Sequence, residues 1–348
     1  MGCLSRARGG AGSLPPRSSV VDNGRRMETE LSAAKHALLE QMLRNEAPKR
    51  RPSVPAQPSA EASDTRTPVV ALQPSGRQRP FFYLHVHWQG GAFYCFNIAR
   101  ALGSDQPFYV FDPYRYDDLP TPPTIETMAA DYLAAIRRIQ PKGPYLLGAF
   151  CGAAPLGYEM AQQLRREGES ADLLAFIDPM ARSLEFTRLT RRLLRWAGLT
   201  PARQLDWFLR LRYLTRVAKG THDEYTEFAD RLIREWNEQH PRRFRVLPDS
   251  GALRRDWLGS FIWALAGYYP QPYPGKVTYL YASENPDSRK LWWGTVRKSG
   301  PGADVRLLPG NHVTCRTTHL DHLTEQLRSC LTAAQTPPAD GPPSSLAS

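Results

Sequence analysis

The sequence predicts an α/β fold with a mostly parallel central sheet, and three features of its 348 residues support this. Short apolar runs typical of buried strands alternate with stretches of helical apolar spacing. One such run, 145–149, is followed by a sharp turn and a helical pattern from about Ala153. Residues 181–270 then interrupt the alternation with helical periodicity alone, which predicts a helical insertion between two core strands.

The first half of the fold follows from the order of these patterns. The apolar runs 68–73 and 80–86 predict a hairpin-like entry of two strands, after which a Gly-rich segment leads into a helix. A third strand is predicted at 107–112, and 125–139 has the apolar spacing of a helix. This helix returns the chain to the strand 145–149 as a right-handed βαβ crossover.

The second half supplies the remaining strands. The run "ADLLAFIDP" at 171–179 is continuously apolar, as expected of a parallel strand buried on both faces. After the insertion, the segment 276–287 predicts a strand with its following loop, 303–310 predicts the last strand, and an amphipathic helix follows. Inside the insertion, one apolar stripe on a helix comprises Leu205, Phe208, Leu209 and Val217.

The ends of the chain differ from this domain, which we place at 66–333. They divide into a disordered extension upstream of Met27 (1–26), a short amphipathic helix (27–45), a Pro/Ala/Ser linker (46–65) and a disordered tail (334–348). The helix fits two interpretations equally well, a docking element for another protein or a helix that lies on its own domain.

Composition excludes several classes of protein. The five cysteines are scattered and fit neither a disulfide framework nor paired metal ligands. No apolar run approaches the roughly 20 residues of a membrane helix, and the N-terminus lacks the apolar core of a signal peptide. The formal net charge of +11 is not accompanied by a nucleic-acid-binding motif. We therefore expect a cytoplasmic protein without membrane insertion or nucleic-acid binding.

The turn after 145–149 carries the main chemical signal. It has the pattern small-x-nucleophile-x-small, with Ala149, Cys151 and Ala153 in the three named places. A nucleophile on such a bend stands clear of the backbone, and the N–H groups of the following helix can hold an oxyanion.

The sequence on both sides of this turn resembles a known family. The segments "QPKGPYLLG" and "YEMAQQLRREGE" are similar to the thioesterase domains that end non-ribosomal peptide and polyketide synthases, members of the α/β-hydrolase superfamily. The resemblance spans roughly 66–333. It departs from the family at Cys151, where Ser is usual, and at Ala149 and Ala153, where Gly is commoner. It implies an α/β-hydrolase fold with a helical lid at about 181–270.

The resemblance also implies a catalytic triad. Cys151 is the expected nucleophile, Asp178 the acid at the end of the strand after the elbow helix, and His312 the general base. His312 follows Gly310 by two, as in the G-x-H that closes the related domains. Two alternatives remain for the acid, Glu284 and Asp287, because many α/β-hydrolases keep it on the loop after the next strand. Asp178 would then only cap a turn.

Two backbone donors are expected to hold the oxyanion. The N–H of Gly152 is one, and the match to the family's H-P-x-G-G segment places the other near Val86 or His87. His85 and His87 also suggest a metal site, but no acidic or Cys partner lies at ligand spacing in the sequence, so packed loop histidines are favoured. No metal is expected, and His319 and His322 on the terminal helix are poor candidates.

The implied reaction is release or editing of acyl chains carried as phosphopantetheine thioesters, through an acyl-Cys151 intermediate. The arm belongs to a carrier protein or synthase module, so we expect no cofactor in the chain itself. Two alternatives remain, an acyltransferase that passes the acyl group to an amine or alcohol, and a non-catalytic partner-binding protein.

The predicted lid has two features whose role stays open. It holds five of the eight tryptophans, which fits an acyl channel or ordinary core packing (Trp196, Trp207, Trp236, Trp257 and Trp263). Residues 182–219 contain ten Lys/Arg and two Asp/Glu, which suits an acidic carrier or a solvated helix surface.

Overall fold

The computed structural model describes residues 66–88, 93–115, 119–179, 184–219, 224–239, 248–284 and 302–336. The expectations for 1–26, 27–45 and 46–65 lie outside these residues.

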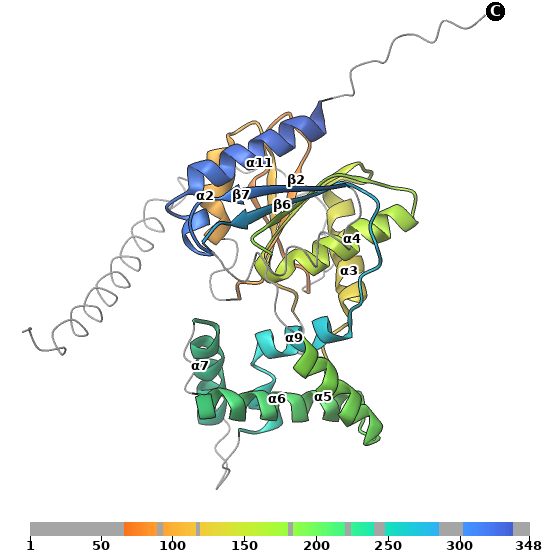
Figure 1. The fold of residues 1–348 in the computed structure, drawn as a ribbon, viewed down its shortest axis with the longest axis vertical. Helices are drawn as coiled ribbons and strands as arrows, with labels where there is room; N and C mark the ends of the chain where they lie inside the picture. Colours follow the sequence, from red (N-terminus) through yellow and green to blue (C-terminus); the bar gives the residue numbers. More distant parts are fainter. Residues whose placement is uncertain are drawn as a thin grey trace, which may run out of the picture. The chain divides into compact units, whose positions relative to one another are not determined.

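The core of the described chain is a seven-stranded sheet in the order β1-β3-β2-β4-β5-β6-β7 (Figure 1). Its strands are β1 (Val69–Gln73), β2 (Phe81–Leu84), β3 (Phe108–Phe111), β4 (Tyr145–Phe150), β5 (Ala171–Ile177), β6 (Val277–Ala282) and β7 (Ala303–Leu308). Every neighbouring pair is parallel except β1 and β3. The prediction of a mostly parallel sheet is confirmed.

The predicted hairpin at the entry is wrong. β1 pairs antiparallel with β3, opposing Val69 to Phe111, while β2 lies between β3 and β4. Burial explains the exchange. All four residues of β2 are buried, so this strand needs neighbours on both sides, whereas β1 is only partly buried and suits the sheet edge.

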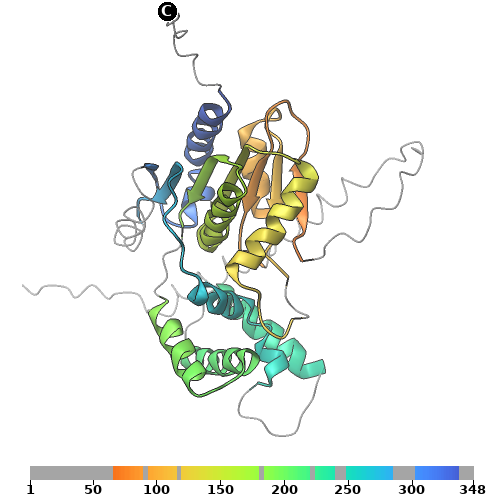
Figure 2. The same ribbon diagram turned by 90° about the vertical axis from the view of Figure 1, so that its right-hand side faces the viewer.

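Helices cover both faces of the sheet. α3 (Ile125–Ile139) and α4 (Ala154–Arg166) pack on one face, and α2 (Phe93–Leu102) and α11 (Leu320–Gln335) on the other (Figures 1 and 2). α3 begins where predicted, because Thr124 caps it by accepting the N–H of Thr127 at 3.2 Å. The result is a three-layered core with an apolar cluster on each side of the sheet.

The predicted start of the tail at residue 334 is two residues too early, since α11 continues to Gln335. The Gln335 side chain accepts the N–H of Arg79 at 2.8 Å and donates to Oε1 of Gln106 at 3.1 Å. These contacts attach the end of α11 to the segment before β2, which explains why the helix extends into a polar sequence.

The described part of the insertion is helical. It contains α5 (Glu185–Trp196), α6 (Pro201–Lys219), α7 (Glu224–Gln239), α8 (Ser250–Leu253) and α9 (Trp257–Gly267). These helices have an apolar core of their own, built from Leu205, Phe208, Leu209, Leu253, Leu258, Ile262 and Trp263. Trp88, just past β2, packs against both this cluster and the main core.

Some apolar residues of the insertion are exposed where the helical pattern predicted burial. Val217 is 62% exposed and does not join the buried stripe, and Trp196 and Trp207 are 90% and 55% exposed. A role for these two indoles in an internal acyl channel is therefore wrong. Trp263 is buried in the lid core, as ordinary packing requires.

The C-terminal end of the insertion is attached to α4 by hydrogen bonds. The hydroxyl of Tyr268, which follows α9, donates to the buried carboxylate of Glu159 at 3.0 Å. The side-chain amide of Gln162 donates to the carbonyl of Gln271 at 2.6 Å. These bonds fix the point where the lid chain re-enters the core domain.

None of the helices formed by the described residues combines the length and the apolar character needed to cross a membrane.

Candidate active site

Cys151 stands on a bend between β4 and α4. The strand ends at Phe150, a single turn of 3-10 helix spans Cys151–Ala153, and α4 begins at Ala154. The φ angle of Cys151 is 54°, in the left-handed region that non-glycine residues seldom adopt. Such backbone strain at a strand-to-helix bend is typical of a nucleophile elbow.

The two alanines beside the elbow fit without the family's glycines. Ala149 and Ala153 are both fully buried. Close approach is provided instead by Gly157, one turn along α4, where a Cβ would lie 3.2 Å from Cε1 of Phe176 on β5. The absence of the two elbow glycines therefore does not prevent α4 from packing closely on the sheet.

Asp178 and His312 lie together, although 134 residues separate them in the sequence. Asp178 follows β5 directly, is 1% exposed, and its Oδ2 is 2.5 Å from Nδ1 of His312. Its other oxygen accepts the N–H of Ala282 at 3.1 Å. Both carboxylate oxygens are thus engaged, which fixes the carboxylate in the plane that the imidazole requires.

His312 also interacts with the thiol of Cys151. Burial alone would lower the pKa of His312, but its side-chain hydrogen bonds with Asp178 and Cys151, together with their charges, raise this pKa to about 9. The imidazole therefore retains a proton readily while it lies between a carboxylate and a thiol. This is the arrangement in which a histidine can accept a proton from a cysteine.

Gly310 explains the local path of the chain that presents His312. Its φ is +82°, and a Cβ there would collide with Oγ1 of Thr314. Thr314 Oγ1 in turn accepts the N–H of Asn311 at 2.7 Å. Only glycine permits this tight turn directly after β7, so the G-x-H spacing has a steric cause.

An aromatic stack around Phe150 was not predicted from the sequence. The Phe150 ring stacks on His312 with centroids 4.8 Å apart, and on His87 with centroids 5.7 Å apart. The guanidinium of Arg316 lies 4.9 Å from the centre of the same ring. The one available signal was that Phe150 precedes the nucleophile and Arg316 follows His312 by four residues.

The thiols of Cys95 and Cys315, near the site, deprotonate less readily than an ordinary cysteine. Burial raises the pKa of Cys95 to about 12, and burial followed by the charge of Asp178 raises that of Cys315 to about 12. Cys315 directs its thiol to the backbone carbonyl of His312 at 3.5 Å. Cys151 differs from both because its thiol is hydrogen-bonded to an imidazole.

The loop after β2 is held by its own histidines. Nδ1 of His85 accepts the backbone N–H of His87 at 3.1 Å, and Nε2 of His85 lies 3.4 Å from the Asp112 carboxylate. Asp112 lies 27 residues from His85 in the sequence, so spacing alone did not reveal this contact, which the end of β3 creates. Val86 and His87 are buried here, and the N–H of His87 is engaged by His85 in this conformation.

His87 is held neutral. Burial, followed by the positive charge of Arg316 and the neighbouring His85 and His312, lowers its pKa to about 3. Across the described residues, no group of three or more His, Cys, Asp or Glu is arranged to hold a metal ion.

Of the other candidates, the structure describes Glu284, His319 and His322. Glu284 is exposed, and its N–H donates to the carbonyl of Gly310 at 3.0 Å. Asp287 lies outside the described residues. His319 packs against Gly310, and His322 is only partly buried on α11. Of the two candidate acids that the structure describes, Asp178 and Glu284, the one in contact with His312 is Asp178.

Access to the site is from the side of the imidazole. Cys151 is 3% exposed, whereas the His312 side chain is 32% exposed. Gly152 is buried next to Cys151 in the 3-10 turn, at the N-terminal end of α4. A substrate would therefore have to approach along His312 to reach the sulfur.

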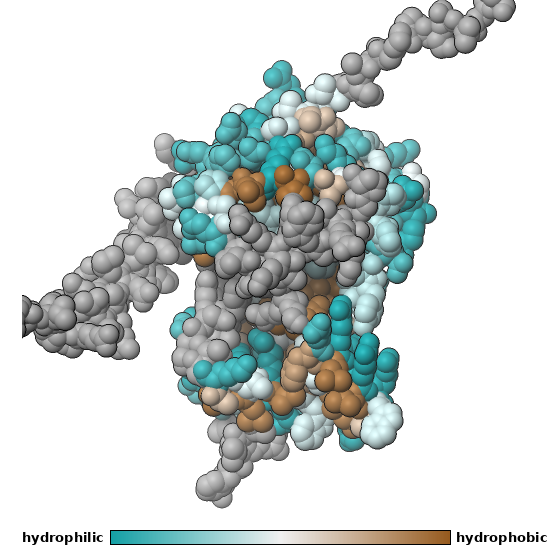
Figure 3. Space-filling model, in the orientation of Figure 1, coloured by the Kyte–Doolittle hydropathy of each residue, from teal (hydrophilic) through white to brown (hydrophobic). Residues whose placement is uncertain are grey.

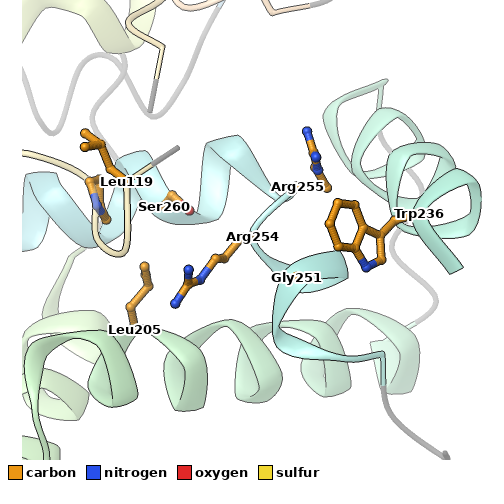
Figure 4. A pocket seen from close by; sticks show the side chains of 8 residues that line it. Leu119, Leu205, Trp236, Gly251, Arg254, Arg255 and Ser260 are labelled. Atoms are coloured by element: carbon orange, nitrogen blue, oxygen red, sulfur yellow. The ribbon is translucent and has the colours of Figure 1, made fainter. Parts of the chain in front are cut away.

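A cavity of about 140 Å³ lies elsewhere, between the lid helices and the loop that holds Leu119 and Pro122 (Figure 4). It is lined by Leu119, Pro122, Leu205, Trp236, Gly251, Arg254, Arg255 and Ser260. Arg254 extends toward Leu205 of α6, and Arg255 covers the indole of Trp236 at 4.8 Å. Its lining includes none of the three residues of the Cys151 site, so the cavity is not where the chemistry described above is placed.

Comparison with known families agrees with the fold and the elbow. The family model described as "Thioesterase domain" matches residues 84–331, which is most of the chain. The matched range includes Cys151, Asp178 and His312. The chain belongs to the thioesterase-domain family and is thus a thioesterase-type enzyme.

Its relatives include large synthetases. The chain is 36% identical to indigoidine synthase of Dickeya dadantii over 125 residues, covering 35% of this chain and 8% of the relative. It is 25% identical to atromentin synthetase nps3 of Serpula lacrymans over 285 residues, covering 76% of this chain and 28% of the relative. The chain thus spans about a quarter or less of the length of these relatives.

A solved structure shares the fold. A four-domain nonribosomal peptide synthetase, holo-AB3403, matches with a TM-score of 0.50 at 20% identity, over 77% of this chain and 20% of that one. The mostly parallel sheet with flanking helices is an α/β-hydrolase fold, as the resemblance implied.

Proposed function

We propose that the chain releases acyl groups that are bound as phosphopantetheine thioesters to a carrier domain, through a covalent acyl-Cys151 intermediate. The observation that carries this proposal is the contact of His312 with two partners, the Cys151 thiol on the strained elbow and the Asp178 carboxylate. The relatives are synthetases of the nonribosomal type, which supports a carrier or synthase module as the partner.

In the first half of the reaction, Nε2 of His312 takes the proton of Cys151 and the sulfur attacks the thioester carbonyl. Asp178 stabilises the imidazolium that forms. The tetrahedral intermediate collapses by breaking the bond to the pantetheine sulfur, which leaves as a thiol with the proton from His312. One thioester has replaced another, so the acyl group stays activated on the enzyme.

In the second half, water enters and His312 removes one of its protons while the oxygen attacks the acyl-Cys151 carbonyl. The carboxylic acid departs and the thiol is restored. An amine or alcohol in place of water would give the acyltransferase reaction by the same steps. The identity of the second acceptor therefore decides between hydrolysis and transfer.

The oxyanion formed in both halves needs donors. The N–H of Gly152 lies at the start of the helix that follows the nucleophile and is the first donor in the proposal. The second is placed in the Val86–His87 segment. Because the His87 N–H is bound to His85, a developing oxyanion would have to displace this bond.

The test is intact-mass spectrometry after incubation with a panel of acyl-carrier thioesters. We expect the wild-type chain to gain the mass of one acyl group, and Cys151→Ala to gain none. Cys330→Ala, a buried cysteine on α11, is the matched control and should acylate normally. Acylation that persists in Cys151→Ala would remove Cys151 from the mechanism, and failure of every thioester to label the wild type would favour a non-catalytic role.

A further inference from the structure

Helix α5 packs on the other lid helices with the less apolar of its two faces. Thr187 and Thr190 are buried, at 6% and 8% exposure. The large apolar residues of the same helix point outward, with exposures of 56% for Phe186, 54% for Leu189, 56% for Leu193 and 90% for Trp196. Their spacing of three, four and three residues places them on one stripe. The helix is amphipathic in the reverse sense to a normal surface helix.

Polar contacts hold α5 in this orientation. The guanidinium of Arg191 lies 4.5 Å from the centre of the Trp263 ring and donates to the carbonyl of Trp263 at 2.7 Å. Arg188 covers the ring of Tyr269 at 4.8 Å. Rolling the helix to bury its apolar stripe would break these contacts. The outward apolar stripe is thus a defined feature of the fold.

The apolar surface continues onto α6. Trp207, Leu211, Leu214 and Val217 are 38% to 62% exposed. Together the two helices carry eight of the twelve large apolar side chains that are exposed in the described residues. In Figure 3, brown groups gather over α5 and along α6. Concentrations of this kind on a soluble domain mark a surface that binds something.

The charges beside this surface are mostly positive. Half of the ten basic residues at 182–219 are engaged within the lid: Arg188, Arg191, Arg210, Arg212 and Arg216. Those left exposed beside the apolar stripe are Arg192, Arg195, Arg203 and Lys219, whereas Glu185 is the exposed acid on the two helices. A second copy of the chain would bring like charges together, so charge complementarity points to an anionic partner.

The apolar stripe of α5 faces away from α9. α9 lies between the outer lid helices and the core, because it contacts α5 through Trp263 and the core loop through Phe261, whose ring is 6.0 Å from that of Trp88. The apolar stripe of α5 is on the side opposite to Trp263. A carrier protein seated on this stripe would have α9 between it and the core domain.

We propose that α5 and α6 bind the surface of an anionic lipid bilayer and hold the enzyme there peripherally. Helices with Phe, Leu and Trp on one face and Arg beside it lie in the bilayer interface, with the aromatic and aliphatic groups in the acyl boundary and the cations at the headgroups. Trp196 at the end of α5 and Arg192 and Arg195 at the edge of its stripe match that arrangement. This inference is independent of the catalytic proposal.

The test is sedimentation of the full chain with phosphatidylcholine vesicles, with and without one-quarter phosphatidylglycerol. We expect binding to the anionic vesicles only, weakened by salt. Leu193→Ser/Trp196→Ser and Arg192→Ala/Arg195→Ala should each reduce the partition coefficient roughly tenfold or more. Leu307→Ser on β7, which is 58% exposed, and Arg165→Ala on α4 are matched controls that should bind as the wild type does.

Several outcomes would overturn the proposal. These are wild-type chain that stays in the supernatant with anionic vesicles, or binding that survives both double variants. A wild-type dimer that Leu193→Ser/Trp196→Ser converts to monomer, or capture of an acidic carrier protein that the same variant abolishes, would assign the surface to those partners instead. Trp196→Ser alone, at the most exposed position, repeats the test if the double variant has a changed circular dichroism spectrum.

Discussion

The carboxyl ends of the central strands and the outer helices of the lid differ in which side chains they bury. At the end of β5, Asp178 is 1% exposed and both of its carboxylate oxygens have partners. On the lid, Trp196 is 90% exposed while Thr187 and Thr190 are buried. The Asp178 carboxylate has its partners within the chain, whereas the apolar stripe of α5 is exposed. Changes at the end of β5 should therefore alter chemistry, and changes on the outer lid should alter association.

The largest effect is expected at the nucleophile. Cys151→Ala removes the attacking sulfur and should reduce turnover of acyl-carrier thioesters by at least about 10³-fold, to the uncatalysed background. The fold should persist, because the substitution removes no contact on which the elbow depends. Release of the carrier thiol, followed with a chromogenic disulfide, measures the rate. Turnover that stays within a factor of two would show that another group attacks.

The next effect is expected at the acid. Asp178→Asn keeps the shape of the side chain but removes the charge that stabilises the imidazolium, and should reduce kcat by roughly 10² to 10⁴-fold. Glu284→Gln is the matched control, because it makes the same change from carboxylate to amide at an exposed residue of the neighbouring loop. It should leave kcat unchanged. A large loss for Glu284→Gln with little loss for Asp178→Asn would move the acid to that loop.

Within the lid, buried and exposed aromatic residues should differ sharply in stability. Phe208 is 2% exposed, so Phe208→Ala should reduce the free energy of unfolding by about 3 to 5 kcal/mol. Trp196→Ser should change it by less than about 0.5 kcal/mol, since the indole contacts mainly solvent. Urea denaturation of both variants provides the comparison. A large destabilisation by Trp196→Ser would mean that the apolar stripe is covered by the chain itself.

The smallest effect is a pH dependence of stability. The folded pKa of His312, about 9, lies above its unfolded value of 6.5, so protonation of this ring stabilises the fold. The contribution is complete below pH 6.5 and is lost as the pH rises through about 9. The difference in urea midpoint between wild type and His312→Gln, measured from pH 6 to pH 10, should shrink over this range. A difference that does not vary with pH would contradict the raised pKa.

Much of the fold could be predicted from the sequence because its elements have strong local signals. The helix Ile125–Ile139 has both its apolar period and its Thr124 cap in the printed residues. The pairing of β1 with β3 could not be predicted, since nothing in the 68–73 run specifies which neighbour it meets. The partner of β1 depends on how deeply each strand is buried, and the burial of one strand is set by the whole sheet.

The candidate site divides in the same manner. The motifs around Cys151 and His312 indicated those residues, and the position of Asp178 at a strand end indicated the third. The stack of Phe150 on His312 and His87, and the approach of Asp112 to His85, depend on three strand ends meeting at one edge. Neither the composition nor the spacing of single segments contains that information. The outward orientation of the α5 stripe could likewise not be predicted. Helical periodicity shows that a helix has an apolar face, but not whether that face packs on the protein or is exposed.

With the His87 N–H as the proposed second oxyanion donor, its bond to His85 has a kinetic consequence. A donor that is already saturated in the resting enzyme offers little to a neutral carbonyl and exchanges partners only for a stronger acceptor. Discrimination would then be exercised while negative charge accumulates on the substrate oxygen, and not when the substrate first docks. A poorly fitting substrate could bind and dissociate without reacting. The enzyme would then discriminate between substrates in the rate of the chemical step more than in binding affinity.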